Sequence, residues 1–243
     1  MKSNALAWVI LLLLARAAMA APPPPDLKLG VPFAGPMALT VLDARPDVVN
    51  GRRKETFLGF GRTFYGLPFP YHTRSKKPFA QDLAALLSQA LKQGQTPAKV
   101  VVASPAAGHQ AAIEPLGKSG AERLILLEIR DWWSDTLFRT DLHYDLLLTI
   151  FDAQGRELAS SSASGEDGLG GHGTNQQPLI DAATRRILET LFADKAVSAA
   201  FQTDAAPTAK AASCTVDQVL KMKEAGLSQE QIEAACGAVS GKP

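Results

Sequence analysis

Residues 121–133 read Ala-Glu-Arg-Leu-Ile-Leu-Leu-Glu-Ile-Arg-Asp-Trp-Trp, and residues 142–155 read Leu-His-Tyr-Asp-Leu-Leu-Leu-Thr-Ile-Phe-Asp-Ala-Gln-Gly. In the second segment apolar and polar side chains alternate, interrupted only by Leu147, which is the period of a half-buried strand. One face carries Leu142, Tyr144, Leu146, Leu148 and Ile150, and the other carries Asp141, His143, Asp145 and Thr149. Residues 152–155 have the chemistry of a short hairpin turn. We therefore predict three consecutive antiparallel strands, with residues 156–163 as the third.

Two amphipathic helices accompany these strands. Apolar residues recur at three- and four-residue steps over Phe79–Gly94 and again over Pro178–Asp194, which is the helical period. Further elements are expected as strands at Met37–Asp43, Lys99–Ala103 and Val197–Phe201, a weaker helix at Pro105–Gly117, and a flexible glycine-rich loop at Gly165–Gly173. The predicted fold is α+β, an antiparallel sheet with the two main helices packed on one face, within residues 30–202.

The first twenty residues have the pattern of an export signal peptide. Lys2 is followed by a short apolar run and then by Ala18-Met-Ala20, a small-x-small site that predicts cleavage after Ala20 or Ala21. The run is shorter than the roughly 20 residues of a spanning helix, although an uncleaved anchor is the alternative. No cysteine lies near the cleavage site for lipid attachment. We expect a periplasmic or secreted protein with no transmembrane anchor after cleavage, beginning with a Pro-rich spacer at residues 21–29.

The charge balance of the chain argues against nucleic acid as a partner. Cleavage removes Lys2 and Arg16, which leaves 25 minus 2 basic residues against 24 acidic residues. Proteins that bind nucleic acid generally carry a strong excess of positive charge on one face. The predicted partner is instead an envelope protein or an anionic envelope component, and the sequence sets no oligomeric state.

The C-terminal residues predict a small separate unit. Residues 203–213 are an alanine-rich linker, and residues 214–237 contain two helix-start patterns, Thr215-Val-Asp-Gln218 and Ser228-Gln-Glu-Gln231. An antiparallel αα-hairpin would bring Cys214 and Cys236 together, and in an oxidising compartment they would form a disulfide. Metal binding is the alternative, but two cysteines without nearby histidines supply only half of a zinc site.

Residues 51–77 form a long connection rich in aromatic and basic side chains. Its six aromatic residues are Phe57, Phe60, Phe64, Tyr65, Phe69 and Tyr71, and only Glu55 opposes its seven cations. Long connections in compact domains are commonly functional, and cation–π contacts are available here. We predict a partner-contact surface that includes Arg62, Tyr65 and Tyr71. The alternative is a satellite core of aromatic residues beneath solvated cations.

Trp132 and Trp133 are adjacent, so one must face away from the other. The outward ring would be a partner anchor if it is uncovered, and Trp133 is the predicted contact. Packing of that ring against the 51–77 connection is the alternative.

No catalytic, cofactor-binding or metal-ligating set is recognised in the sequence. The only histidine with nearby carboxylates is His143, which shares a strand face with Asp141 and Asp145. Such a trio could act as an acid–base pair or simply be the solvated face of a strand. The glycine-rich residues 165–173 lack the Gly-Lys-Ser/Thr of a phosphate-binding loop.

The order of elements resembles the YajG-type family of bacterial envelope lipoproteins over about residues 30–200. The resemblance is carried by Leu39-Thr-Val-Leu-Asp43-Ala-Arg45, Phe57-Leu-Gly59, the helix at residues 79–94, Trp132–Leu137, Asp141-Leu-His-Tyr-Asp-Leu146 and Ile150-Phe-Asp-Ala-Gln-Gly155. It implies an envelope protein and no catalytic residues. This chain departs from the lipoprotein pattern because it lacks a lipidated cysteine.

These patterns together predict a non-catalytic accessory or interaction protein of the cell envelope. Its expected contact surfaces are the 51–77 connection and the C-terminal hairpin. The alternative is a small-ligand binding protein or hydrolase with a pocket under the 51–77 connection.

Overall fold

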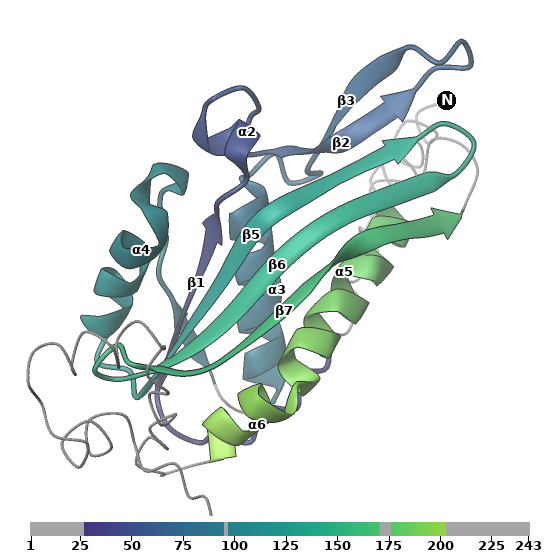
Figure 1. Ribbon diagram of the computed structural model, residues 1–243. Helices are drawn as coiled ribbons and strands as arrows, with labels where there is room; N and C mark the ends of the chain where they lie inside the picture. The colour runs from purple at the N-terminus through teal and green to yellow at the C-terminus, as the bar shows by residue number, and fades with distance from the viewer. Residues whose placement is uncertain (1–26, 95–96, 171–175, 203–243) are drawn as a thin grey trace, which may run out of the picture. The chain divides into compact units, whose positions relative to one another are not determined.

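The computed structural model describes residues 27–94, 97–170 and 176–202 (Figure 1). Its strands are β1 Met37–Asp43, β2 Phe57–Arg62, β3 Pro68–His72, β4 Ala98–Val100, β5 Arg123–Thr136, β6 Thr140–Asp152 and β7 Glu157–Gly170. Its helices are α2 Pro46–Val49, α3 Phe79–Gln93, α4 Gly108–Gly117, α5 Gln177–Ala193 and α6 Lys195–Gln202, with a 3-10 turn η2 at Pro105–Ala107. The fold is a mixed α/β structure in which all the described strands join one sheet.

The predicted antiparallel meander is confirmed as β5, β6 and β7. β5 pairs with β6 along its length, for example Ile125 with Ile150, and β6 pairs with β7 in the same sense. The alternation read from β6 is also confirmed, since Leu142, Leu146, Leu148 and Ile150 are fully buried. β7 continues to Gly170, so most of the glycine-rich segment expected as a flexible loop is a strand. Pairing with β6 satisfies its backbone and outweighs the low strand propensity of glycine.

The sheet is mixed, so the prediction of an antiparallel sheet was imprecise. The other edge of β5 carries two strands in succession, both parallel to it: β1 pairs with residues 123–129, and β2 pairs with residues 134–136. β4 adds to β1, again in parallel. Parallel neighbours need a crossover connection, and α3 and α4 lie in the connections that lead to β4 and β5.

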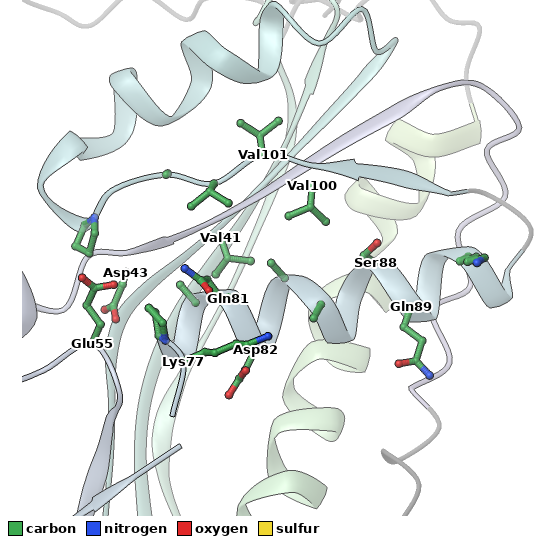
Figure 2. A pocket seen from close by; sticks show the side chains of 18 residues that line it. Val41, Asp43, Glu55, Lys77, Gln81, Asp82, Ser88, Gln89, Val100 and Val101 are labelled. Atoms are coloured by element: carbon green, nitrogen blue, oxygen red, sulfur yellow. The ribbon is translucent and has the colours of Figure 1, made fainter. Parts of the chain in front are cut away.

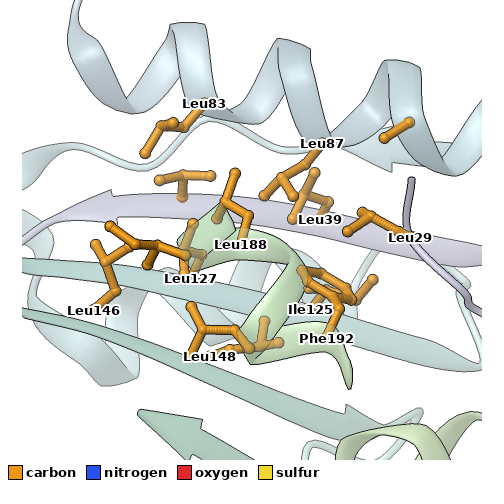
Figure 3. Close-up of a cluster of buried hydrophobic side chains, with 14 of the residues drawn as sticks. Leu29, Leu39, Leu83, Leu87, Ile125, Leu127, Leu146, Leu148, Leu188 and Phe192 are labelled. Atoms are coloured by element: carbon orange, nitrogen blue, oxygen red, sulfur yellow. The ribbon is translucent and has the colours of Figure 1, made fainter. Parts of the chain in front are cut away.

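Helices cover both faces of the sheet. The two main predicted helices, α3 and α5, are confirmed and share one face, where their apolar side chains meet those of β1, β5 and β6 (Figure 3). The predicted weaker helix is present as η2 and α4, and it packs on the opposite face against Leu124, Leu126 and Phe151. α4 therefore covers the end of the sheet where β5 starts and β6 ends, and no other helix of the described residues contributes buried side chains to the apolar cluster on that face.

The strand expected at residues 197–201 is wrong, because these residues form α6. Val197, Ala200 and Phe201 are buried, a spacing that places them on one side of a helix. Asp194 Oδ1 accepts hydrogen bonds from the amides of Ala196 at 2.8 Å and Val197 at 3.3 Å, which caps the helix start. The signal that a sequence reading could have used is this aspartate immediately before the helix.

Several predictions lie outside the described residues. These are the signal peptide with its cleavage at Ala20 or Ala21, most of the Pro-rich spacer, the linker, and the hairpin with Cys214 and Cys236. None of the helices within the described ranges combines the length and the hydropathy needed to cross a bilayer.

Candidate functional site

The 51–77 connection is an ordered β-hairpin rather than a loop. β2 and β3 pair in antiparallel fashion from Phe57 with His72 to Arg62 with Pro68. The turn between them is closed by the Thr63 amide, which donates to the Leu67 carbonyl at 2.9 Å. Four of the six aromatic residues, Phe57, Phe60, Phe69 and Tyr71, therefore lie on two strands that extend the sheet, together with Arg62. Phe64 and Tyr65 lie in the turn, and the other six cations lie outside the strands.

Gly59 allows β2 to approach β5 closely. It has φ +149°, and a Cβ built at this position would lie 2.2 Å from the carbonyl oxygen of Ser134 and 2.4 Å from its amide nitrogen. Both are backbone atoms of β5 that cannot move aside, so any larger residue would push the hairpin away from the sheet. This contact fixes the direction in which the hairpin projects.

A buried ion pair holds the base of the hairpin. Arg45 and Asp43 are 4% and 1% exposed, and Arg45 donates Nε to Asp43 Oδ1 at 2.8 Å and Nη2 to Asp43 Oδ2 at 2.6 Å. The same guanidinium donates Nη1 to the carbonyls of Phe57 at 2.6 Å and Trp132 at 3.3 Å. It thus fills the gap between β1 and β2 along the edge of β5.

The tips of the β2–β3 hairpin and of the β5–β6 hairpin project at the same end of the sheet (Figure 1). In the β2–β3 turn Phe64, Tyr65 and Leu67 are 88%, 87% and 65% exposed, and in the β5–β6 turn Phe138 is 69% exposed. Since β2 runs parallel to β5, their ends lie side by side. We call Phe64, Tyr65, Leu67, Leu137 and Phe138 the tip cluster.

Arg62 ties the two hairpins together below the tip cluster. Its Nε donates to Asp135 Oδ1 at 2.7 Å, its Nη2 forms a second bond to Oδ2, and its Nη1 donates to the Gly66 carbonyl at 3.4 Å. This hydrogen bonding lowers the pKa of Asp135 and raises the pKa of Arg62. Arg62 is a predicted contact residue, but its charge is already paired with Asp135 within the protein.

The other predicted contact residues have different environments. Tyr65 is exposed at the tip, whereas Tyr71 is half-buried and donates its hydroxyl to Gln177 Oε1 at 2.5 Å; burial raises its pKa. Trp133 is half-buried, and its ring stacks on His143 with centroids 4.0 Å apart and planes 4° apart. Trp132 is the inward ring, 1% exposed and packed on Phe79. Tyr65 is thus the predicted contact residue whose side chain is mostly exposed, whereas Arg62, Tyr71 and Trp133 contact other parts of the protein.

The aromatic residues of the hairpin divide between core and surface. Phe57 is buried, and the Arg53 guanidinium lies over its ring at 4.7 Å and over Phe60 at 4.8 Å. Beside these rings is a cavity of about 520 Å³ that Arg130 and Trp133 also line. The base of the segment thus fits the satellite-core alternative, and its tip fits the contact-surface prediction.

His143 does not form an acid–base pair with its strand neighbours. Its Nδ1 lies 3.6 Å from Glu166 Oε2 on β7, while Asp141 pairs with Arg139. Within the described ranges, no three histidine, cysteine or acidic side chains converge as a possible metal site. Among the described residues, His143 lies on the polar face of β6, where its ring stacks on Trp133 of β5.

No family model matches the chain, and no curated protein matches it. Among solved structures it is similar to protein XCC0632 from Xanthomonas campestris, described under DUF330, with 13% identity, 70% of this chain and 83% of that chain covered, and a TM-score of 0.38. It is also similar to the PelC dodecamer from Paraburkholderia phytofirmans, with 11% identity, 71% and 96% coverage and a TM-score of 0.37. It is also similar to lipoprotein GNA1162 from Neisseria meningitidis, with 15% identity, 63% of this chain and 98% of that chain covered, and a TM-score of 0.27. Similarities at this level assign neither a family nor a function.

Proposed function

We propose that this chain is a non-catalytic interaction protein of the cell envelope, distantly related to the YajG-type proteins, that contacts an envelope protein through its tip cluster. The export pattern of residues 1–20 supports the compartment. The predicted C-terminal hairpin offers a second contact surface.

The observation that carries the proposal is the exposure of Phe64 and Tyr65, at 88% and 87%. Their rings contact each other edge to face, with centroids 5.7 Å apart, and Leu67 lies in the same turn at 65% exposure. Isolated exposed apolar residues are ordinary on protein surfaces, but a contiguous cluster marks an interaction site. Aromatic side chains are also enriched among the residues that contribute most to binding energy in interfaces.

Specific contacts hold the scaffold beneath the cluster, which favours recognition by preformed shape. Arg62 and Asp135 connect the two hairpins, and Gly59 seats β2 directly on β5. Because the backbone of the tip is already held, binding costs little ordering entropy.

A photocrosslinking amino acid placed at Tyr65 in the exported full chain tests the proposal in cells. We expect a discrete protein adduct, identified by mass spectrometry. The same crosslinker at Val49, which is 44% exposed on α2, is the control and should give no such adduct.

The variant that removes the contact is Phe64→Ser/Tyr65→Ser/Leu67→Ser, and a crosslinker placed at Phe138 reports whether the partner still binds. Since all three side chains point into solvent, the melting temperature should stay near that of the wild type while the adduct is lost. A folded triple variant with an unchanged adduct would remove the tip cluster as the contact. Adducts only with lipid or polysaccharide would replace the protein partner by an anionic envelope component.

A second candidate function is the binding of a small ligand in the cavity of about 520 Å³ beside Phe60 and Trp133. Apolar rings and the charged groups of Arg130 and Asp131 converge there, as a small-molecule site requires. Native mass spectrometry of the protein purified from its own envelope tests this candidate. A retained small molecule that is lost in Phe60→Ser would favour it, and an unliganded mass would count against it.

A further inference from the structure

The edge of the sheet at β4 leaves backbone groups without partners. Beyond β4 the chain continues alongside β1, since the Val101 amide donates to the Leu39 carbonyl at 2.8 Å and the Thr40 hydroxyl donates to the Val101 carbonyl at 2.6 Å. In a strand, alternate residues direct their amide and carbonyl groups to opposite edges. Because Val101 faces β1, Val100 and Val102 face outward, and the Val102 amide has no hydrogen bond to any described residue.

A groove runs between this edge and α3. It has a volume of about 660 Å³, and Figure 2 shows Val100 on one side and Gln81, Ser88 and Gln89 of α3 on the other. The wall formed by α3 extends from Ala80 to Lys92, which at 1.5 Å per residue is about 18 Å. An extended chain rises about 3.3 Å per residue, so the groove accommodates about five residues of a strand.

Exposed aliphatic side chains line the same edge. Val100 is aligned with Leu39, whose side chain belongs to the core under α3, so Val100 and Val102 point to the α3 side of the sheet. They are 39% and 71% exposed. Edge strands in proteins are usually protected by charges, prolines or a covering segment. Lys99 is the only charged residue at positions 98–103, and it lies on the opposite face.

We infer that this groove binds an extended segment of another polypeptide, which adds to the sheet as a strand beside β4. The outward groups of Val100 and Val102 hydrogen-bond to the backbone of the segment, and the pleat sets its side-chain pattern. Every second side chain of the segment faces α3 and the two valines and is apolar, while those between them face away. This site is separate from the tip cluster and is independent of the function proposed above.

The row of outward backbone groups selects a peptide over a small molecule as the occupant. A compact ligand could fill the apolar part of the groove, but it would not hydrogen-bond to all the outward amide and carbonyl groups along the edge. A peptide strand satisfies these groups in register and covers both valines.

The test uses the full mature chain and a random peptide library displayed on phage. We expect the selected peptides to share apolar residues at every second position. Their synthetic forms should lose about tenfold in affinity for Val102→Pro, because proline removes the outward amide while no hydrogen bond of the fold is lost. Circular dichroism and thermal unfolding establish that the variant is folded.

N-methylation of the selected peptide gives a second measurement on the unaltered protein. Methyl groups at alternate residues, the ones whose amides face the β4 edge, should weaken binding about tenfold, and methyl groups at the residues between them should not. Failure to select peptides, peptides without a two-residue period, or equal effects of methylation at every position would overturn the inference. Loss of the tip cluster by Phe64→Ser/Tyr65→Ser should leave peptide binding unchanged.

Discussion

The buried pair of Asp43 and Arg45 gives the sharpest test of how the hairpin is attached. Arg45→Met keeps an unbranched apolar stem but removes the guanidinium. It leaves the Asp43 carboxylate, 1% exposed, without its bidentate partner. It also leaves the carbonyls of Phe57 and Trp132 without the Nη1 donor.

The expected loss of unfolding free energy is about 3–5 kcal/mol, the cost of an uncompensated buried charge. Part of a typical domain stability of about 5–15 kcal/mol would remain. Replacing both partners, as in Asp43→Leu/Arg45→Met, removes the unpaired charge and should recover much of the loss. The two single variants and the double variant therefore form a cycle with a strongly non-additive result.

Urea denaturation followed by tryptophan fluorescence measures these energies, because Trp132 lies beside the pair. The slope of unfolding free energy against urea should be unchanged in each variant, which shows that the same two states are compared. Lys118→Met breaks the exposed pair with Glu114 and is the control, with no measurable change expected. A loss below about 1 kcal/mol for Arg45→Met, or additive effects in the cycle, would contradict this account of the buried pair.

Three further predictions follow from particular positions. Gly59→Ala should lower the unfolding free energy by at least about 2 kcal/mol in urea denaturation, because it combines strain at positive φ with a clash against the backbone of β5. Gly61→Ala is the control and should cost less, because its methyl group meets only the exposed phenyl ring of Phe69. Equal losses in the two variants would contradict the argument. Burial tends to raise the pKa of Asp152, but hydrogen bonds from backbone amides and a guanidinium in the same turn lower it overall. The pKa of Asp152 in the folded protein thus lies below the unfolded value of about 3.9. The ionised carboxylate therefore stabilises the fold above that pH, and this stabilisation is lost as the pH falls through the folded pKa. The difference in unfolding free energy between the wild type and Asp152→Asn should shrink from pH 7 to about pH 3, and a constant difference would disprove the pKa shift. For the exported chain, intact mass after alkylation without reductant should show Cys214 and Cys236 unmodified, and two alkyl groups would exclude the predicted disulfide.

Local periodicity explains which parts of the fold were predictable. Leu142, Tyr144, Leu146, Leu148 and Ile150 occupy every second position. Because alternate side chains of a strand lie on the same face, this spacing is enough to predict which face is buried. The apolar stripes of α3 and α5 likewise report one buried side each. The sequence therefore predicted the meander and the helices that cover one face.

The errors occur where a distant partner decides the local structure. Residues 165–170 have a poor strand composition, yet β6 supplies a complete set of backbone partners and draws them into β7. β2 has only a short alternating pattern, and its pairing with β5 across Gly59 and Ser134 turns an expected loop into a strand. For β1, the apolar run predicts a strand but does not distinguish a parallel neighbour from an antiparallel one.

The candidate site was predictable as a segment but not as individual contacts. The density of aromatic and basic residues drew attention to positions 51–77, which the structure shows as a hairpin with Tyr65 exposed at its tip. Arg62 and Tyr71 have the same composition signal, but Asp135 and Gln177 engage them across 73 and 106 residues of sequence. Which cation is paired and which ring is covered depends on these long-range neighbours.

By itself the sequence determined the export pattern, the near-neutral charge, and the faces of β6, α3 and α5, because each of these is written in composition or in a repeat of a few residues. Long-range contacts in the folded chain place β1 and β2 on one edge of β5, put Arg45 in the gap between them, and bring the two apolar tips side by side. The physical reason is that burial of a face follows from local spacing, whereas pairing requires backbone and side-chain groups far apart in the chain to satisfy each other's hydrogen bonds.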